Sequence, residues 1–112
     1  MLLGMNSAPN AVEAVLHALS SCMTVSFIYP AAAQGIRVDA LEYTMEGDVD
    51  LHGFLQLSDK IRPGLQNIRV KAKVKADAPR EKIQELLDYA AKTSPVMDTI
   101  RNPVTVSVEL AE

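Results

Sequence analysis

The sequence predicts a small α+β domain, and three observations carry that prediction. Apolar residues occupy almost every side of the helical wheel between Val12 and Tyr29, which is typical of a buried helix. Residues 67–75 alternate apolar and charged or polar side chains, the pattern of a strand with one buried face. Residues 83–91 carry apolar side chains at the three-four spacing of an amphipathic helix.

The first helix has recognisable ends. Ser7 can cap it, and Pro9 stands where a first-turn proline is tolerated. Pro30 is expected to kink or break the helix, with a short helical piece continuing to Ala33, and Gly35 suits the terminating position. The acidic, imidazole and hydroxyl side chains of this stretch make it too polar for a lone membrane span, so a buried helix is expected.

Strands are expected near residues 36–46, 66–76 and 104–110, together forming the sheet that supports the long helix. The apolar phase slips between Ala40 and Leu41, which predicts a bulge or a turn of the strand face. Residues 47–64 are interpreted as a long, irregular connection.

The second helix should pack outside the sheet by one face. Asp77 and Pro79 are expected to open it. The triplet Thr93-Ser94-Pro95 ends it and begins a short turn of helix through Ile100, for which Ser94 is the expected cap.

Composition excludes several classes of function. The chain has 112 residues, which is one domain, and a formal net charge of -3, which gives no broad attraction to nucleic acid or anionic lipid. With no Trp, one Cys and two His, a base-stacking platform, an internal disulfide and a metal site are not expected, and no cofactor motif is present. The first residues lack the pattern of a signal peptide, so a cytoplasmic protein without a membrane or nucleic-acid partner is predicted.

Cys22 is the first candidate for chemistry, because a thiolate is a strong nucleophile at neutral pH. The alternative is structural, since free cysteine is often a small buried side chain. The neighbouring hydroxyl residues Ser20, Ser21 and Thr24 are consistent with a pocket beside the helix or with close helix packing.

Two other side chains on the helix are candidate helpers of the thiol, Glu13 and His17. Glu13 can orient a cation or a peroxide, or simply occupy the favourable first turn. Nine residues place it roughly 13.5 Å from Cys22 along the helix axis and on the opposite side, so the two can cooperate only through a bend or between two chains. His17 lies about 140° around the helix from Cys22, which argues against a Cys-His pair.

Three segments together resemble the OsmC/Ohr family, named for osmotically inducible protein C and organic hydroperoxide resistance protein. SAPNAVEAVLHALSSCMTV resembles its central helix, and GLQNIRVKAKVKADAPREKIQELLDYAAKTSPVMDTI resembles its later strand, helix and second active-site turn. PVTVSVEL resembles its last strand. The resemblance covers nearly the whole chain and rests on joint order and spacing.

The resemblance implies a thiol-dependent peroxidase fold that works as an intertwined homodimer, with active sites at the dimer interface. The family's peroxidatic cysteine falls on Cys22, and its glutamate matches Glu13 by position in the motif. Ser94 stands where other members carry a second, resolving cysteine, so Cys22 needs an external thiol reductant. The family's N-terminal strands, one of which brings an active-site arginine, have no counterpart in residues 1–112.

Two functions from different classes follow. The first is an enzyme that reduces organic or hydrogen peroxides through Cys22, with an external reductant and with Glu13 as an electrostatic helper. The second is a non-catalytic dimeric module that uses an apolar pocket for a small hydrophobic ligand; a truncated chain without activity is a third reading. A dimer or higher oligomer is expected in each full-length case, because an all-round apolar helix needs cover.

Overall fold

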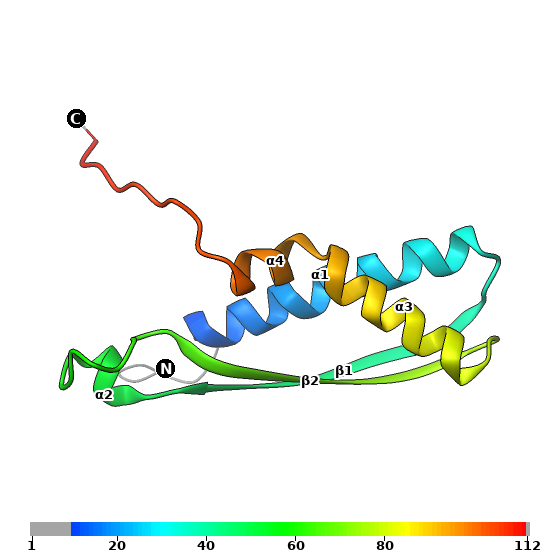
Figure 1. Ribbon diagram of the computed structural model, residues 1–112, viewed down its shortest axis with the longest axis horizontal. Helices are drawn as coiled ribbons and strands as arrows, with labels where there is room; N and C mark the ends of the chain where they lie inside the picture. The colour runs from blue at the N-terminus through cyan, green and yellow to red at the C-terminus, as the bar shows by residue number, and fades with distance from the viewer. Residues whose placement is uncertain (1–9, 112) are drawn as a thin grey trace.

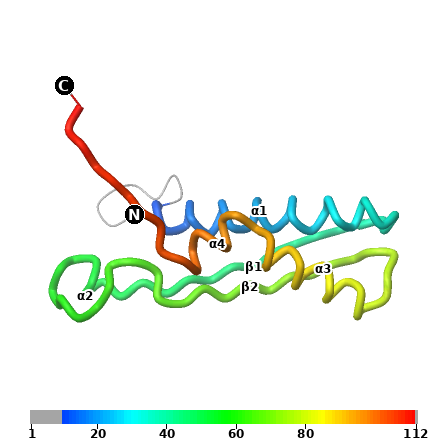
Figure 2. The backbone as a smooth tube through the Cα atoms, turned by 45° about the horizontal axis from the view of Figure 1, so that its top comes forward, coloured from blue at the N-terminus to red at the C-terminus, as the bar shows by residue number. Residues whose placement is uncertain are grey.

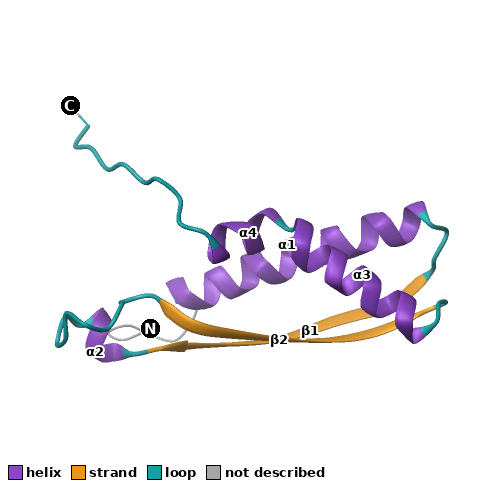
Figure 3. Ribbon diagram, in the orientation of Figure 1, coloured by secondary structure: helices purple, strands orange, loops and turns teal. Residues whose placement is uncertain are grey.

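Two long antiparallel strands and a long helix form the frame of the molecule, in a computed structural model that describes residues 10–111. The elements are α1 (Ala11–Ala33), β1 (Val38–Val49), α2 (Leu51–Phe54), β2 (Leu65–Ala76), α3 (Arg80–Thr93) and α4 (Pro95–Arg101). The helices α1, α3 and α4 all lie on one side of the β1–β2 hairpin (Figures 1 and 3). The predicted α+β class, with a long helix packed on a sheet, is confirmed.

The ends of α1 differ in part from the prediction. Asn10 is its cap, and the Asn10 side chain accepts a hydrogen bond of 2.8 Å from the Glu13 N–H; Ser7 and Pro9 lie outside the described residues. The expected break at Pro30 is wrong, since the helix runs through it to Ala33. A proline removes only one helical N–H, and a continuous buried stripe holds both sides of it in place. Gly35 ends the helix with a φ of 72°, as predicted.

One stripe of α1 is buried. Leu19, Met23, Phe27 and Ala31 follow each other at intervals of four residues and face the hairpin and α3. Phe27 and Ala31 join Leu86 and Ala90 of α3 in the core. By length and composition α1 could cross a membrane, but its packed stripe fits the core helix of a globular domain. Other apolar side chains of α1 are exposed, among them Val25 at 59% and Tyr29 at 77%.

The hairpin pairs opposite charges across its outer face. Glu42 stands opposite Lys73 and Glu46 opposite Arg69, so β1 balances part of the basic face of β2, whereas Lys71 and Lys75 stand opposite Thr44 and Ala40. Arg69 donates two hydrogen bonds to Asp48, of 2.8 and 3.0 Å, and these lower the pKa of the Asp48 carboxyl. This pairing is consistent with a solvated sheet face rather than a nucleic-acid surface.

The pairing of β1 with β2 confirms the predicted slip in strand phase, and the connection between the two strands is shorter than expected. The pairing shifts between Val38 and Ala40, next to the predicted bulge. The expected irregular segment 47–64 is partly ordered, because β1 continues to Val49 and α2 follows at once.

The predicted third strand is wrong for the single chain. Residues 103–111 have no regular secondary structure and run away from the body (Figures 1 and 2). The apolar side chains that should share its inner face are exposed, at 57%, 75%, 91% and 98% for Val104, Val106, Val108 and Leu110. A strand needs a neighbouring edge, and within the described residues the sheet has two strands only.

The first testable prediction concerns the core. Phe27→Ala should lower the free energy of unfolding by about 3–5 kcal/mol, because Phe27 is fully buried and its removal leaves a cavity. Denaturant unfolding measures the change. Lys92→Ala, at an exposed position of α3, is the control and should stay within about 0.5 kcal/mol. Equal effects of the two changes would contradict the packing described above.

Candidate functional site

The turn between α3 and α4 brings Ser94 against Cys22. The Ser94 hydroxyl lies 2.9 Å from the Cys22 sulfur and donates a hydrogen bond to it. Ser94 is at once the last cap of α3 and the first cap of α4. Its own N–H donates to the Ala90 carbonyl and its carbonyl accepts from the Asp98 N–H, both at 3.0 Å. The backbone on both sides therefore fixes where this hydroxyl points.

Ser94 has the environment of a core residue. Ser94 is 0% exposed, and among residues 10–111 it is the one polar residue that is buried. Its oxygen also accepts a hydrogen bond of 3.2 Å from the Met97 N–H, so the predicted cap of the short helix is confirmed. The Ser94 hydroxyl therefore accepts one hydrogen bond from the Met97 N–H and donates one to the Cys22 sulfur.

Cys22 is partly exposed, in the middle of α1. The hydroxyl residues around it are used in different ways. Thr24 donates to the Ser20 carbonyl one turn earlier, at 2.8 Å, which is a helix-packing role. Ser21 faces solvent. The contact that distinguishes Cys22 therefore comes from Ser94, 72 residues later in the chain.

Neither proposed helper on α1 reaches the thiol within one chain. Glu13 is exposed in the first turn, where its N–H is capped by Asn10. Because α1 is continuous from Ala11 to Ala33, no bend brings Glu13 to Cys22. His17 is exposed as well.

No metal site is found among residues 10–111, where no group of three or more His, Cys, Asp or Glu side chains is suitably placed. His52 instead bonds to Asp50, with 2.9 Å between its Nδ1 and the carboxylate oxygen. The His52 backbone N–H, followed by this ring contact, lowers the pKa of the Asp50 carboxyl. Asp50 caps α2, so this pair is part of the hairpin end.

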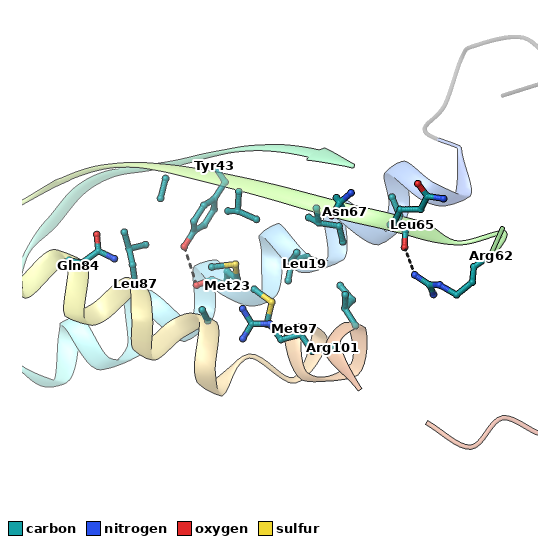
Figure 4. A pocket seen from close by; sticks show the side chains of 16 residues that line it. Leu19, Met23, Tyr43, Arg62, Leu65, Asn67, Gln84, Leu87, Met97 and Arg101 are labelled. Carbon is teal, nitrogen blue, oxygen red and sulfur yellow. Dashed lines mark hydrogen bonds between the residues drawn. The ribbon is translucent and has the colours of Figure 1, made fainter. Parts of the chain in front are cut away.

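A cleft of about 680 Å³ opens between the hairpin and the helices (Figure 4). Leu19 and Met23, which flank Cys22 on α1, line it together with Met97 of α4. Tyr43 reaches across from β1, and its hydroxyl lies 3.4 Å from the Met23 carbonyl. Partial burial raises the pKa of Tyr43.

Sequence reasoning did not identify the polar residues of this cleft. Arg62 and Arg101 line it, and Arg62 donates a 3.3 Å hydrogen bond to the Leu65 carbonyl. In the described part of the chain, no hydrogen bond joins either arginine to Cys22, so neither fills the place of the arginine that the resemblance implies. The sequence feature that could have pointed to Arg101 is its place in the last turn of the short helix. A basic residue there is equally explained by its favourable interaction with the helix dipole.

Comparison with solved structures shows where this arrangement recurs. An OsmC-like protein from Mycoplasma pneumoniae superimposes with a TM-score of 0.75 and 19% identity, over 89% of this chain and 69% of that one. An OsmC-like hydroperoxide resistance protein from Jannaschia sp. gives 0.67 and 16%, over 97% and 71%. An OsmC-like protein of unknown function from Vibrio cholerae gives 0.66 and 17%, over 80% and 56%. At these identities the likeness establishes the fold.

Comparison at the level of sequence supplies the family. A search of curated proteins finds no match. The family model described as OsmC-like protein matches residues 4–109, which is nearly the whole chain and includes Cys22 and Ser94. On this match, with which the fold agrees, the chain belongs to the OsmC-like protein family.

Proposed function

We propose that the protein reduces organic or hydrogen peroxides through Cys22. The observation that carries the proposal is the pairing of a partly exposed thiol with a buried hydroxyl that donates to its sulfur at 2.9 Å. A hydrogen bond donated to sulfur favours the thiolate, which is the reactive form. Cys22 is partly exposed rather than fully buried, as a thiol that meets a small substrate should be.

The chemistry runs in two stages. The Cys22 thiolate attacks one peroxide oxygen, an S–O bond forms while the O–O bond breaks, and the leaving alkoxide or hydroxide takes a proton and departs as alcohol or water. Sulfur is thereby oxidised to sulfenic acid. An external thiolate then attacks that sulfur, water leaves, and a mixed disulfide forms. A second external thiol releases Cys22, so the reductant ends as a disulfide.

The external reductant is needed because Ser94 cannot take the second role. A hydroxyl does not form a disulfide with a sulfenic acid, and the chain has a single cysteine. The proposed partners are therefore a peroxide, a dithiol outside the chain, and a second copy of the protein.

A second copy also gives Glu13 a place in the site. Glu13 and Cys22 lie on either side of a point between residues 17 and 18 of α1. If two copies of α1 packed antiparallel about an axis at that point, Glu13 of one copy would be level with Cys22 of the other along the helix axis, and the crossing angle of the helices would have to close the half-turn that separates the two residues. Its carboxylate could then orient the substrate across the interface.

A second candidate function rests on the cleft. Its volume of about 680 Å³ is of the size that takes a small ligand, and apolar side chains such as Leu19 and Met97 share its walls with polar ones such as Arg62. Cys22 is not among the residues that line it, so binding there needs no thiol chemistry. In that case the protein is a non-catalytic dimeric module on the same scaffold.

Steady-state peroxide consumption separates the two functions. We expect the protein to consume tert-butyl hydroperoxide or hydrogen peroxide with dithiothreitol as reductant, and Cys22→Ser to lose the activity above background, since the hydroxyl is a far weaker nucleophile. Ser21→Ala, at the exposed neighbouring position, is the matched control and should retain it. If Cys22→Ser consumes peroxide as fast as the unchanged protein, the thiol is not the site.

A further inference from the structure

We propose that Ser94 is a positioning residue whose hydroxyl, aimed at the Cys22 sulfur, supports that sulfur as the nucleophile and so sets the reactivity of the site. The inference rests on the proposed function and deepens it. It replaces the reading of Ser94 as an empty resolving position with an active role for its hydroxyl.

The direction of the Ser94 proton follows from its contacts. A serine hydroxyl has one proton to donate and lone pairs to accept with. The Met97 N–H points at the oxygen from 3.2 Å, so that contact uses a lone pair. The proton is left for the Cys22 sulfur, 2.9 Å away, and Ser94 is 0% exposed, so bulk solvent does not compete for it.

The geometry favours one charge state of the sulfur. A neutral thiol is a weak acceptor, whereas a thiolate is a strong one, and hydrogen bonds to charged groups are shorter and stronger than those between neutral groups. A donor held in place before ionisation therefore stabilises the thiolate relative to the thiol. Because the backbone of Ser94 is bonded to both α3 and α4, the donor is already oriented.

The same contact ties the thiol to α4. This helix contributes no fully buried residue of its own, and the buried residue at its start is Ser94. Met97, Ile100 and Arg101 of α4 form one wall of the cleft. A shift at the start of α4 therefore moves the Ser94 hydroxyl relative to the Cys22 sulfur. By thermodynamic linkage, a stronger hydrogen bond to that sulfur also strengthens the packing of α4 against α1.

Three variants test the role of the hydroxyl. Ser94→Gly removes the donor but keeps most of the helix cap, Ser94→Ala removes both, and Ser94→Thr keeps both. At a fixed, mildly acidic pH, alkylation of Cys22 by iodoacetamide should slow by about tenfold in the Gly and Ala variants alike, because a hydrogen bond to a charged group is worth about that factor. Ser94→Thr should restore the rate.

The comparison of Gly with Ala separates positioning from structure. If Ser94 acts only as a cap, Ser94→Ala lowers the melting temperature and changes the alkylation rate, while Ser94→Gly changes both much less. Equal rates in all three variants and the unchanged protein would overturn the proposal.

A measurement on the unchanged protein covers the case in which the variants do not fold. The chain has one cysteine, so any S–H stretching band in the infrared belongs to Cys22. Near neutral pH this band should be weaker in the native protein than in the urea-unfolded protein; an equal or stronger native band would contradict the proposal. A protein that shows the Ser94 effects on alkylation but does not consume peroxide would contradict the proposed function and support this inference. A protein that consumes peroxide but shows no Ser94 effect on alkylation would support the proposed function and contradict this inference.

Discussion

Ser94→Cys should form a disulfide with Cys22 under mild oxidation. The Ser94 oxygen already lies 2.9 Å from the Cys22 sulfur, so a sulfur at the same position needs only a small rotation to reach a bonding distance of about 2.04 Å. The new thiol would also act as the missing resolving group. It would attack the sulfenic acid on Cys22, release water, and leave an intramolecular disulfide that a dithiol can reduce.

Intact mass and non-reducing peptide maps measure the bridge in Ser94→Cys. The loss of the cap at the start of α4 costs about 1 kcal/mol, so the fold should survive. Thr99→Cys, on the exposed face of α4, is the matched control because it also exchanges a hydroxyl for a thiol. Two free thiols in an intact, oxidised Ser94→Cys protein would show that the juxtaposition, and with it the placement of the site, is wrong.

The protein should sediment as a dimer or higher oligomer at micromolar concentration. The single chain exposes apolar residues on α1 and along residues 104–110. Its sheet consists of one hairpin, and a two-stranded hairpin is marginal on its own and has open edges. Residues 104–110 have the alternation of a strand and pair with no strand within residues 10–111, so we expect them to pair with a second copy. A folded monomer at that concentration would contradict this expectation.

A pair of substitutions in the C-terminal segment tests how the copies meet. Val106 is 75% exposed in the single chain, so Val106→Asp would change the stability of a monomer by no more than about 0.5 kcal/mol. If Val106 packs against a second copy, the same change should destabilise the assembly by at least about 2 kcal/mol and shift it toward monomer. Ser107→Asp adds the same charge on the opposite face and should leave the assembly intact. Sedimentation of both variants decides; equal behaviour would contradict pairing by this face.

Local patterns were sufficient for most elements of the fold. The long helix α1, the two long strands, the amphipathic α3 and the slip near Ala40 follow from spacing within a few residues, but the predicted all-round burial of α1 is reduced to one buried stripe in the single chain. The predicted break of α1 at Pro30 is wrong, because the packing of Phe27 and Ala31 in the core outweighs the one helical hydrogen bond that the proline removes. Residues 104–110 were placed in the sheet because alternation identifies a strand but not its partner.

The candidate site was less accessible to local reasoning. Helix geometry alone separated Glu13 from Cys22, and the structure agrees. The contact between Cys22 and Ser94 joins residues 72 positions apart, and only the family resemblance placed them together. The sequence indicates a pocket beside the helix but not its walls, because Tyr43, Arg62 and Met97 come from three separate parts of the chain that meet only after folding.

The reaction of the native protein with peroxide tests the central claim most directly. Stoichiometric cumene hydroperoxide should convert Cys22 to sulfenic acid, read as one added oxygen by intact mass spectrometry and trapped with dimedone, and an excess should drive it to sulfinic acid because no second thiol protects it. The reaction should be faster than that of free cysteine at the same pH. An unmodified thiol after prolonged exposure would contradict peroxide reduction by Cys22 and leave the ligand-binding function as the better account.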